Sequence, residues 1–138
     1  AAGMAVSEGL TAQVRGFQQG MENANEAIAL LQTAEGSYNS ISDIMIRMRE
    51  LAVQAASDTL TDKERAYLNT EFEDLTAEIT RISDVAEYNG IQLLTGTSGA
   101  TANGDMVFQV GTRNTVNDQI KITLKDQDST ALGIETLG

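Results

Sequence analysis

The chain has 138 residues, of which 20 are acidic and 9 are basic, so its net charge at pH 7 is −11. This charge would repel the phosphate backbone of a nucleic acid over most of the surface. Cysteine and histidine are both absent, which excludes disulfides and removes the usual general base and the commonest metal ligand. We therefore expect no nucleic-acid partner, no cofactor and no enzymatic activity.

No stretch of sequence reaches the run of about 18 apolar residues that spans a bilayer. The first ten residues lack the basic start of a secretory signal. We therefore expect no membrane insertion. The chain begins without methionine in a segment that already has helical periodicity, which suggests that it is a piece of a longer protein.

Apolar or small residues recur at alternating spacings of four and three over the first 57 residues, with one phase slip beside Gly36. This heptad pattern predicts one long helix over residues 4–57. Such a helix would be about 80 Å long, whereas a compact domain of this size is about 35–40 Å across. We therefore predict a rod that needs neighbouring helices. The predicted core stripe is Leu10, Val14, Phe17, Met21, Ala24, Ile28, Leu31, Ala34, Tyr38, Ile41, Met45, Met48, Ala52 and Ala55.

A second helix is predicted over residues 61–87. Thr61 with Glu64 three residues later is a capping-box signature, and a second heptad stripe follows through Leu68, Phe72, Leu75, Ile79, Ile82 and Ala86. The short connection should fold this helix back antiparallel on the first. The expected fold class is mainly α, a rod-like coiled-coil bundle of a long and a shorter helix with a small β-hairpin region.

The rest of the chain is predicted to be less regular. Residues 88–105, which are rich in glycine and asparagine, are expected to form a loop, and alternating polarity over 106–125 predicts a β-hairpin. The tail 126–138 is expected to be extended or a short helical turn, with Ser129 or Thr130 as a possible cap. The carboxylates of 71–74 and the turn residues near 103–105 and 117–119 suggest solvated surface rather than metal sites.

The end of the long helix carries side chains beyond its core stripe. If Ile41, Met45, Met48, Ala52 and Ala55 face the core, Arg47, Leu51 and Gln54 lie together on one flank. A pivot near Thr59 brings Glu71 to the height of Arg47. These four residues are therefore predicted to form a contact patch, the alternative being that isolated apolar residues are normal on protein surfaces.

Several long stretches resemble bacterial flagellin: LLQTAEGSYNSISDIMIRMRELAVQAASDT, EITRISDVAEYNGIQLLTG, FQVGTRNTVNDQIKITLKD and ALGIETLG. The resemblance implies the N-terminal half of the conserved rod domain. The family's extreme N-terminal helix, outer domains and C-terminal helices are missing. The chain alone is therefore not expected to build a normal filament.

The resemblance also implies partners. They are other flagellin subunits in an extracellular filament that serves motility, the flagellar type III export apparatus, and the vertebrate innate immune receptor TLR5. The receptor contacts that the motifs carry over are Arg47, Leu51, Gln54, Glu71 and Glu78. Ile46 is a departure, because the family often has glutamine there. The alternatives are a flagellin-like surface receptor or adhesin, and a hook–filament junction protein.

Overall fold

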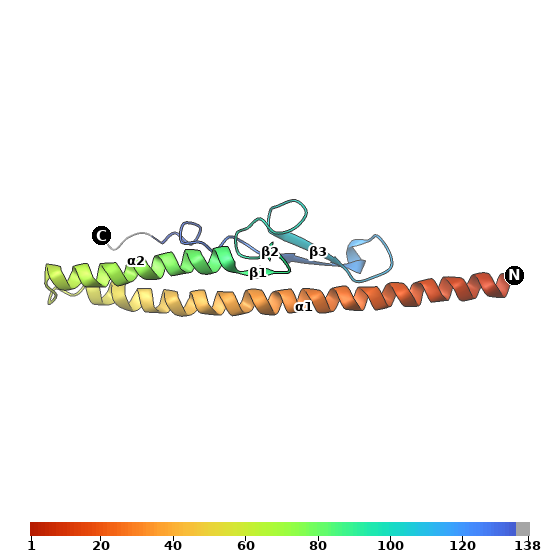
Figure 1. Cartoon of the computed structure of the whole chain (residues 1–138), viewed down its shortest axis with the longest axis horizontal. Helices are drawn as coiled ribbons and strands as arrows, with labels where there is room; N and C mark the ends of the chain where they lie inside the picture. The colour runs from red at the N-terminus through yellow and green to blue at the C-terminus, as the bar shows by residue number, and fades with distance from the viewer. Residues whose placement is uncertain (135–138) are drawn as a thin grey trace.

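Two antiparallel helices dominate the computed structural model, which describes residues 1–134 (Figure 1). Helix α1 spans Ala2–Ala55 and helix α2 spans Asp62–Val85. Helix α2 runs beside the C-terminal part of α1, whereas the N-terminal end of α1 extends with no other element beside it (Figure 1). With 54 residues, α1 is about 80 Å long. The predicted fold class, a rod of a long and a shorter helix with a small β-hairpin region, is confirmed.

The helix boundaries differ slightly from the predicted ranges of 4–57 and 61–87. Helix α1 begins two residues earlier and ends two earlier, and α2 ends at Val85. The capping box is present, because Glu64 N donates to Thr61 Oγ1 (3.3 Å) and Thr61 N donates to Glu64 Oε2 (2.8 Å). The hydrogen bonds from Thr61 lower the pKa of the Glu64 carboxyl. Arg65 closes the inter-helix turn by donating to the carbonyls of Ala55 and Ser57. These hydrogen bonds supply donors for carbonyl groups that have no partner within the helix at the C-terminal end of α1.

The segment that the sequence predicted as loop 88–105 contains a small hairpin. Strand β1, Glu87–Tyr88, pairs antiparallel with strand β2, Ile91–Gln92. Asn89 and Gly90 connect the strands with φ angles of 51° and 77°, and left-handed conformations at both central residues are what a tight two-residue hairpin turn requires. The strands are too short to show periodicity, so the Asn-Gly pair was their main sequence signal.

The predicted β-hairpin at 106–125 consists of strand β3, Asp105–Gln109, and strand β4, Gln119–Thr123. The short 3-10 helix η1, Val116–Asp118, lies in their connection. Two strands alone are marginally stable. Here the hairpin packs along α1, and the Asn23 Nδ2 amide donates to the Gln109 carbonyl over 2.7 Å.

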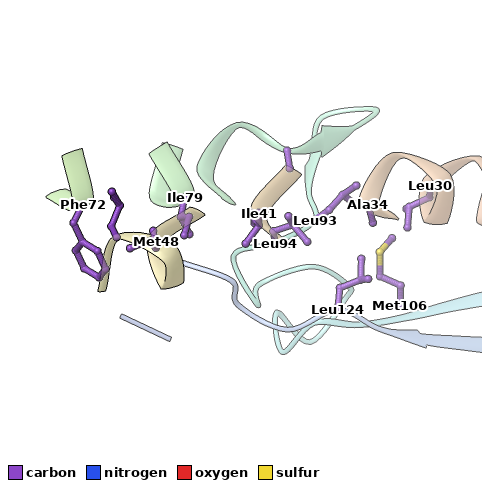
Figure 2. Close-up of a cluster of buried hydrophobic side chains, with 12 residues drawn as sticks. Leu30, Ala34, Ile41, Met48, Phe72, Ile79, Leu93, Leu94, Met106 and Leu124 are labelled. Atoms are coloured by element: carbon purple, nitrogen blue, oxygen red, sulfur yellow. The ribbon is translucent and has the colours of Figure 1, made fainter. Parts of the chain in front are cut away.

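The hydrophobic core is one elongated cluster along the rod. Figure 2 shows Phe72 and Met48 near one end and Leu30 and Met106 near the other. Both helices, the segment after β2 and the β3–β4 hairpin contribute to it, so a single core joins the hairpin to the two helices. Its buried members are Leu30, Ala34, Ile41, Met48, Leu51, Phe72, Ile79, Ala86, Leu93, Leu94, Met106 and Leu124.

The tail over residues 126–134 packs back on α2. The hydroxyls of Ser129 and Thr80 lie 2.9 Å apart. A single hydrogen-bonded turn is capped by Asp128, whose Oδ1 accepts from Ala131 N over 2.6 Å, rather than by the predicted Ser129 or Thr130. The remainder of the tail prediction, 135–138, lies outside the described residues. In the described part of the chain, neither helix has an apolar stretch long enough to cross a bilayer.

Helix α1 has two apolar stripes, whereas the sequence predicted a single stripe. Its buried residues are Gly20, Ala27, Leu30, Ala34, Ile41, Met48 and Leu51. The predicted core residues of the N-terminal half are instead 42–67% exposed, namely Leu10, Val14, Phe17, Met21, Ile28 and Leu31. At about 100° per residue, this exposed stripe lies roughly 140° round the helix from the buried one. The physical reason is close approach: a Cβ on Gly20 would lie 2.2 Å from the Val110 carbonyl oxygen, so at this position α1 meets the backbone of the hairpin and no side chain fits between them.

Candidate functional site

The structure brings Arg47 and Glu71 together across the two helices. Arg47 Nε donates to Glu71 Oε1 over 2.9 Å, and Arg47 Nη1 donates to Glu50 Oε2 over 3.1 Å. The hydrogen bonds that Arg47 donates to Glu50 and Glu71 raise the pKa of its guanidinium. The predicted patch did not include Glu50, although its i,i+3 spacing from Arg47 could have indicated the contact.

The Arg47–Glu71 pair is accessible to a partner. The two side chains are 48% and 43% exposed, and exposed ion pairs of this kind contribute only about 0–1 kcal/mol to stability. Arg47 could therefore exchange a carboxylate of its own chain for one of a binding partner at little cost in stability.

The expectation that Leu51 lies on this surface is wrong. Leu51 is 0% exposed and belongs to the core cluster. In this part of α1 the core stripe runs through Ile41, Ile44, Met48 and Leu51, whereas Met45, which was predicted in the core, is 41% exposed. These four side chains therefore face the core, and Leu51 lies beneath the Arg47–Glu71 surface and does not form part of it.

Gln54 and Glu78 extend the patch in opposite directions. Each lies seven residues beyond its neighbour, Gln54 after Arg47 on α1 and Glu78 after Glu71 on α2, and seven residues return to the same side of a helix about 10 Å along it. Gln54 is exposed. Both carboxylate oxygens of Glu78 accept from Arg81, at 2.7 and 2.6 Å, and these bonds lower the pKa of Glu78. Glu78 is thus outside the Arg47 network.

We define the Arg47 surface as Arg47, Glu50, Gln54 and Glu71. It is polar and exposed, it is shared by both helices, and Arg47 forms ion pairs with both Glu50 and Glu71. Within residues 1–134 no group of three or more histidine, cysteine, aspartate or glutamate side chains is placed to hold a metal ion. Such a surface fits recognition by another protein.

The exposed stripe of α1 is a second candidate surface, and sequence reasoning assigned all of its residues except Val6 to the core. Val6 and Phe17 belong to it with 63% and 52% exposure, and a shallow groove runs beside Val6, Leu10 and Val14. Contiguous apolar patches of this kind mark protein–protein contacts. We call this surface the α1 stripe: Val6, Leu10, Val14, Phe17, Met21, Ile28 and Leu31.

The heptad-patterned rod, the exposed α1 stripe and the polar Arg47 surface define a protein of the elongated, helical-rod class. Comparison with known proteins identifies which one. The family model for the bacterial flagellin N-terminal helical region matches residues 1–99. The chain belongs to the bacterial flagellin family, which is a family of structural proteins.

Individual relatives agree with this assignment. The chain is 45% identical over 97 residues to a flagellin of Halalkalibacterium halodurans, covering 70% of this chain and 36% of that protein. It is 37% identical over 134 residues to flagellin 1 of Proteus mirabilis, covering 97% and 35%. It is 34% identical over 143 residues to the flagellar filament 31.3 kDa core protein of Treponema maltophilum, covering 100% and 49%. The chain thus spans less than half the length of these three relatives.

A solved structure gives the same answer for the fold. The crystal structure of Bacillus cereus flagellin superimposes with a TM-score of 0.68 at 30% sequence identity, covering 82% of this chain and 63% of that one. The long helix, the returning helix and the small antiparallel hairpins therefore form the flagellin arrangement.

Proposed function

We propose that this chain is the N-terminal part of a structural subunit of the bacterial flagellar filament. The observation that carries the proposal is the α1 stripe, a heptad-spaced apolar surface whose residues are 42–67% exposed. Burying apolar surface gains about 25 cal/mol per Å², so a stripe this long favours association with further helices. The name of the Treponema maltophilum relative supports a filament role over the adhesin and hook-junction alternatives.

A filament also needs contacts that do not close on themselves. A rod whose surfaces differ along its length can make head-to-tail contacts, and such contacts generate an open helical assembly when the rotation between neighbours does not close a ring. The α1 stripe and the Arg47 surface lie at opposite ends of α1 (Figure 1). This separation suits a subunit with different neighbours at each end, and it is consistent with an extracellular filament that is assembled after export through the flagellar type III apparatus.

We expect Phe17→Glu in the full-length protein to abolish filament formation, because the charge would be buried at a helix contact. Phe17 is 52% exposed in the isolated rod, so the subunit itself should fold normally. Electron microscopy and a swimming assay would measure the loss, and circular dichroism would verify the fold. Ala12→Glu is the matched control, since Ala12 is exposed and lies on the opposite side of α1. Normal filaments from Phe17→Glu would contradict the proposal.

We propose in addition that the Arg47 surface is a contact for the innate immune receptor TLR5. What supports this is the accessible Arg47–Glu71 pair, which joins α1 to α2 on one exposed face. Arginine is enriched among the residues that dominate binding energy. Because Leu51 is buried, we expect it to affect receptor binding through the position of α1 and not by direct contact.

Arg47→Ala is expected to weaken receptor activation by at least about tenfold, the effect of losing roughly 1.4 kcal/mol at a binding hot spot. Glu71→Ala should have a smaller effect, because it removes a partner of Arg47. A receptor reporter assay with the full-length protein would measure both. Arg113→Ala, an 82% exposed arginine in the β3–β4 connection, is the control. Activation unchanged by Arg47→Ala would eliminate the assignment, and a simultaneous loss of swimming would show that the surface also serves the filament.

A further inference from the structure

The chain contains two asparagine–glycine pairs, Asn89–Gly90 and Asn103–Gly104. In such a pair the glycine nitrogen can attack the asparagine side chain, since the glycine has no side chain to shield it. The sequence makes the two sites equivalent, but the fold makes them very different. We propose that Asn89 is a site of spontaneous deamidation and that the fold protects Asn103.

Asn89 has the freedom that the reaction needs. Asn89 and Gly90 are both exposed in the turn between β1 and β2, and a Cβ built on Gly90 would meet no atom within 4 Å. In the described structure no hydrogen bond holds the Asn89 side chain, and the Gly90 N–H makes no turn or loop bond to the backbone. The hairpin has two paired positions, Glu87↔Gln92 and Tyr88↔Ile91, and the hydrogen bonds that extend it, from Leu93 N to the Ala86 carbonyl and from Gln92 Nε2 to the Asp84 carbonyl, lie at its open end, away from Asn89. A hairpin this short opens locally at low cost.

Asn103 is held at both of the groups that would have to react. Its Oδ1 accepts from Thr101 Oγ1 (2.7 Å) and from Asp105 N (3.0 Å), and its Nδ2 donates to Asp105 Oδ2 (3.2 Å). The Gly104 nitrogen donates to the Ser98 carbonyl over 2.9 Å. Gly104 is also buried, and a Cβ there would lie 2.1 Å from the Leu124 carbonyl oxygen. The segment therefore has no room to rotate into the reactive geometry.

The proposed reaction consumes one water molecule and is not a redox step. The Gly90 nitrogen loses its proton to water and forms a bond to Asn89 Cγ, and the Cγ–Nδ2 bond breaks as ammonia leaves with a proton. The resulting cyclic imide is opened by water at either carbonyl. One product has aspartate at position 89, and the other has isoaspartate, in which the main chain runs through the former side chain.

The two products should differ in their effect on the rod. Aspartate keeps the turn, because Asp-Gly suits the same hairpin geometry as Asn-Gly, and it adds one negative charge to the surface. Isoaspartate lengthens the main chain within the turn and disrupts both residue pairs of the hairpin. Strand β2 leads directly into Leu93 and Leu94, which are 0% exposed core residues. Leu93 N also donates to the Ala86 carbonyl over 2.9 Å. The isoaspartate form should therefore loosen this part of the core.

Peptide mapping by mass spectrometry after warm incubation at mildly alkaline pH tests the proposal. Asn89 in the folded 138-residue chain, with its helical content verified by circular dichroism, should deamidate at least about tenfold faster than Asn103, since reactivity follows local opening. In denaturant the two sites should react at similar rates, which shows that the fold causes the difference. Asn89→Gln should remove the signal at this position, and labelling by an isoaspartate methyltransferase should identify the isoaspartate product.

Two results would overturn the inference. One is equal reaction at Asn89 and Asn103 in the folded chain, which would mean that the hydrogen bonds of Asn103 give no protection. The other is a folded chain in which Asn89 stays intact while it reacts in denaturant, which would mean that the β1–β2 turn is itself protective.

Discussion

Replacing Leu51 by alanine is expected to lower the free energy of unfolding by about 2–5 kcal/mol, the usual range for removing a fully buried leucine side chain. Leu51 is 0% exposed and lies in the core between α1 and α2. Total stabilities of domains are about 5–15 kcal/mol, so this one change would remove a large part of the stability. Urea denaturation followed by circular dichroism would measure it.

Val53→Ala is the matched control, because Val53 is two residues away and 70% exposed. Its effect should stay within about 0.5 kcal/mol. Equal effects of the two substitutions would mean that α2 does not pack on the Leu51 side of α1. The comparison also bears on the receptor proposal, since weaker binding by Leu51→Ala would accompany lost stability, whereas Arg47→Ala should reduce binding in a stable rod.

Gly20→Ala is expected to destabilise the rod by about 1–3 kcal/mol, the usual cost of overpacking. The new Cβ would lie 2.2 Å from the Val110 carbonyl oxygen, and because that atom belongs to the backbone, the β3–β4 hairpin would have to move away from α1. The same substitution at an unconstrained helical position gains stability, since alanine is favoured over glycine in helices by about 1 kcal/mol. Urea denaturation would give the free energy, and limited proteolysis would report hairpin displacement.

Two other glycines of α1 provide a graded control. A Cβ at Gly36 would meet nothing within 4 Å, so Gly36→Ala should stabilise the helix. A Cβ at Gly16 would lie 2.7 Å from Thr112 Cγ2, a side-chain atom that can rotate away, so Gly16→Ala should fall between the other two. A stabilising Gly20→Ala would show that the hairpin does not approach α1 as closely as described.

Some features of the structure could be predicted from residues that lie close together in the sequence. The capping box of Thr61 and Glu64 could be predicted because it depends on residues three apart, and the β3–β4 hairpin because its alternation is regular. The meeting of Arg47 and Glu71 followed from counting residues on either side of the inter-helix turn. The burial of Leu51 could not be predicted in the same way, because several stripes of α1 have almost the same spacing.

The amino-acid sequence by itself determined that this protein is a mainly helical rod and that it resembles flagellin, since heptad spacing and long motifs are local properties of the chain. Only the tertiary structure decided which stripe of α1 is the core. The hairpin and α2 cover one side, where Gly20 and Ala27 permit close approach, and they leave Phe17 and its neighbours exposed. Tertiary contacts likewise make the expected reactivity of Asn103 differ from that of Asn89. The physical reason in both cases is that burial depends on which distant segment packs against a residue, and spacing along the chain does not contain that information.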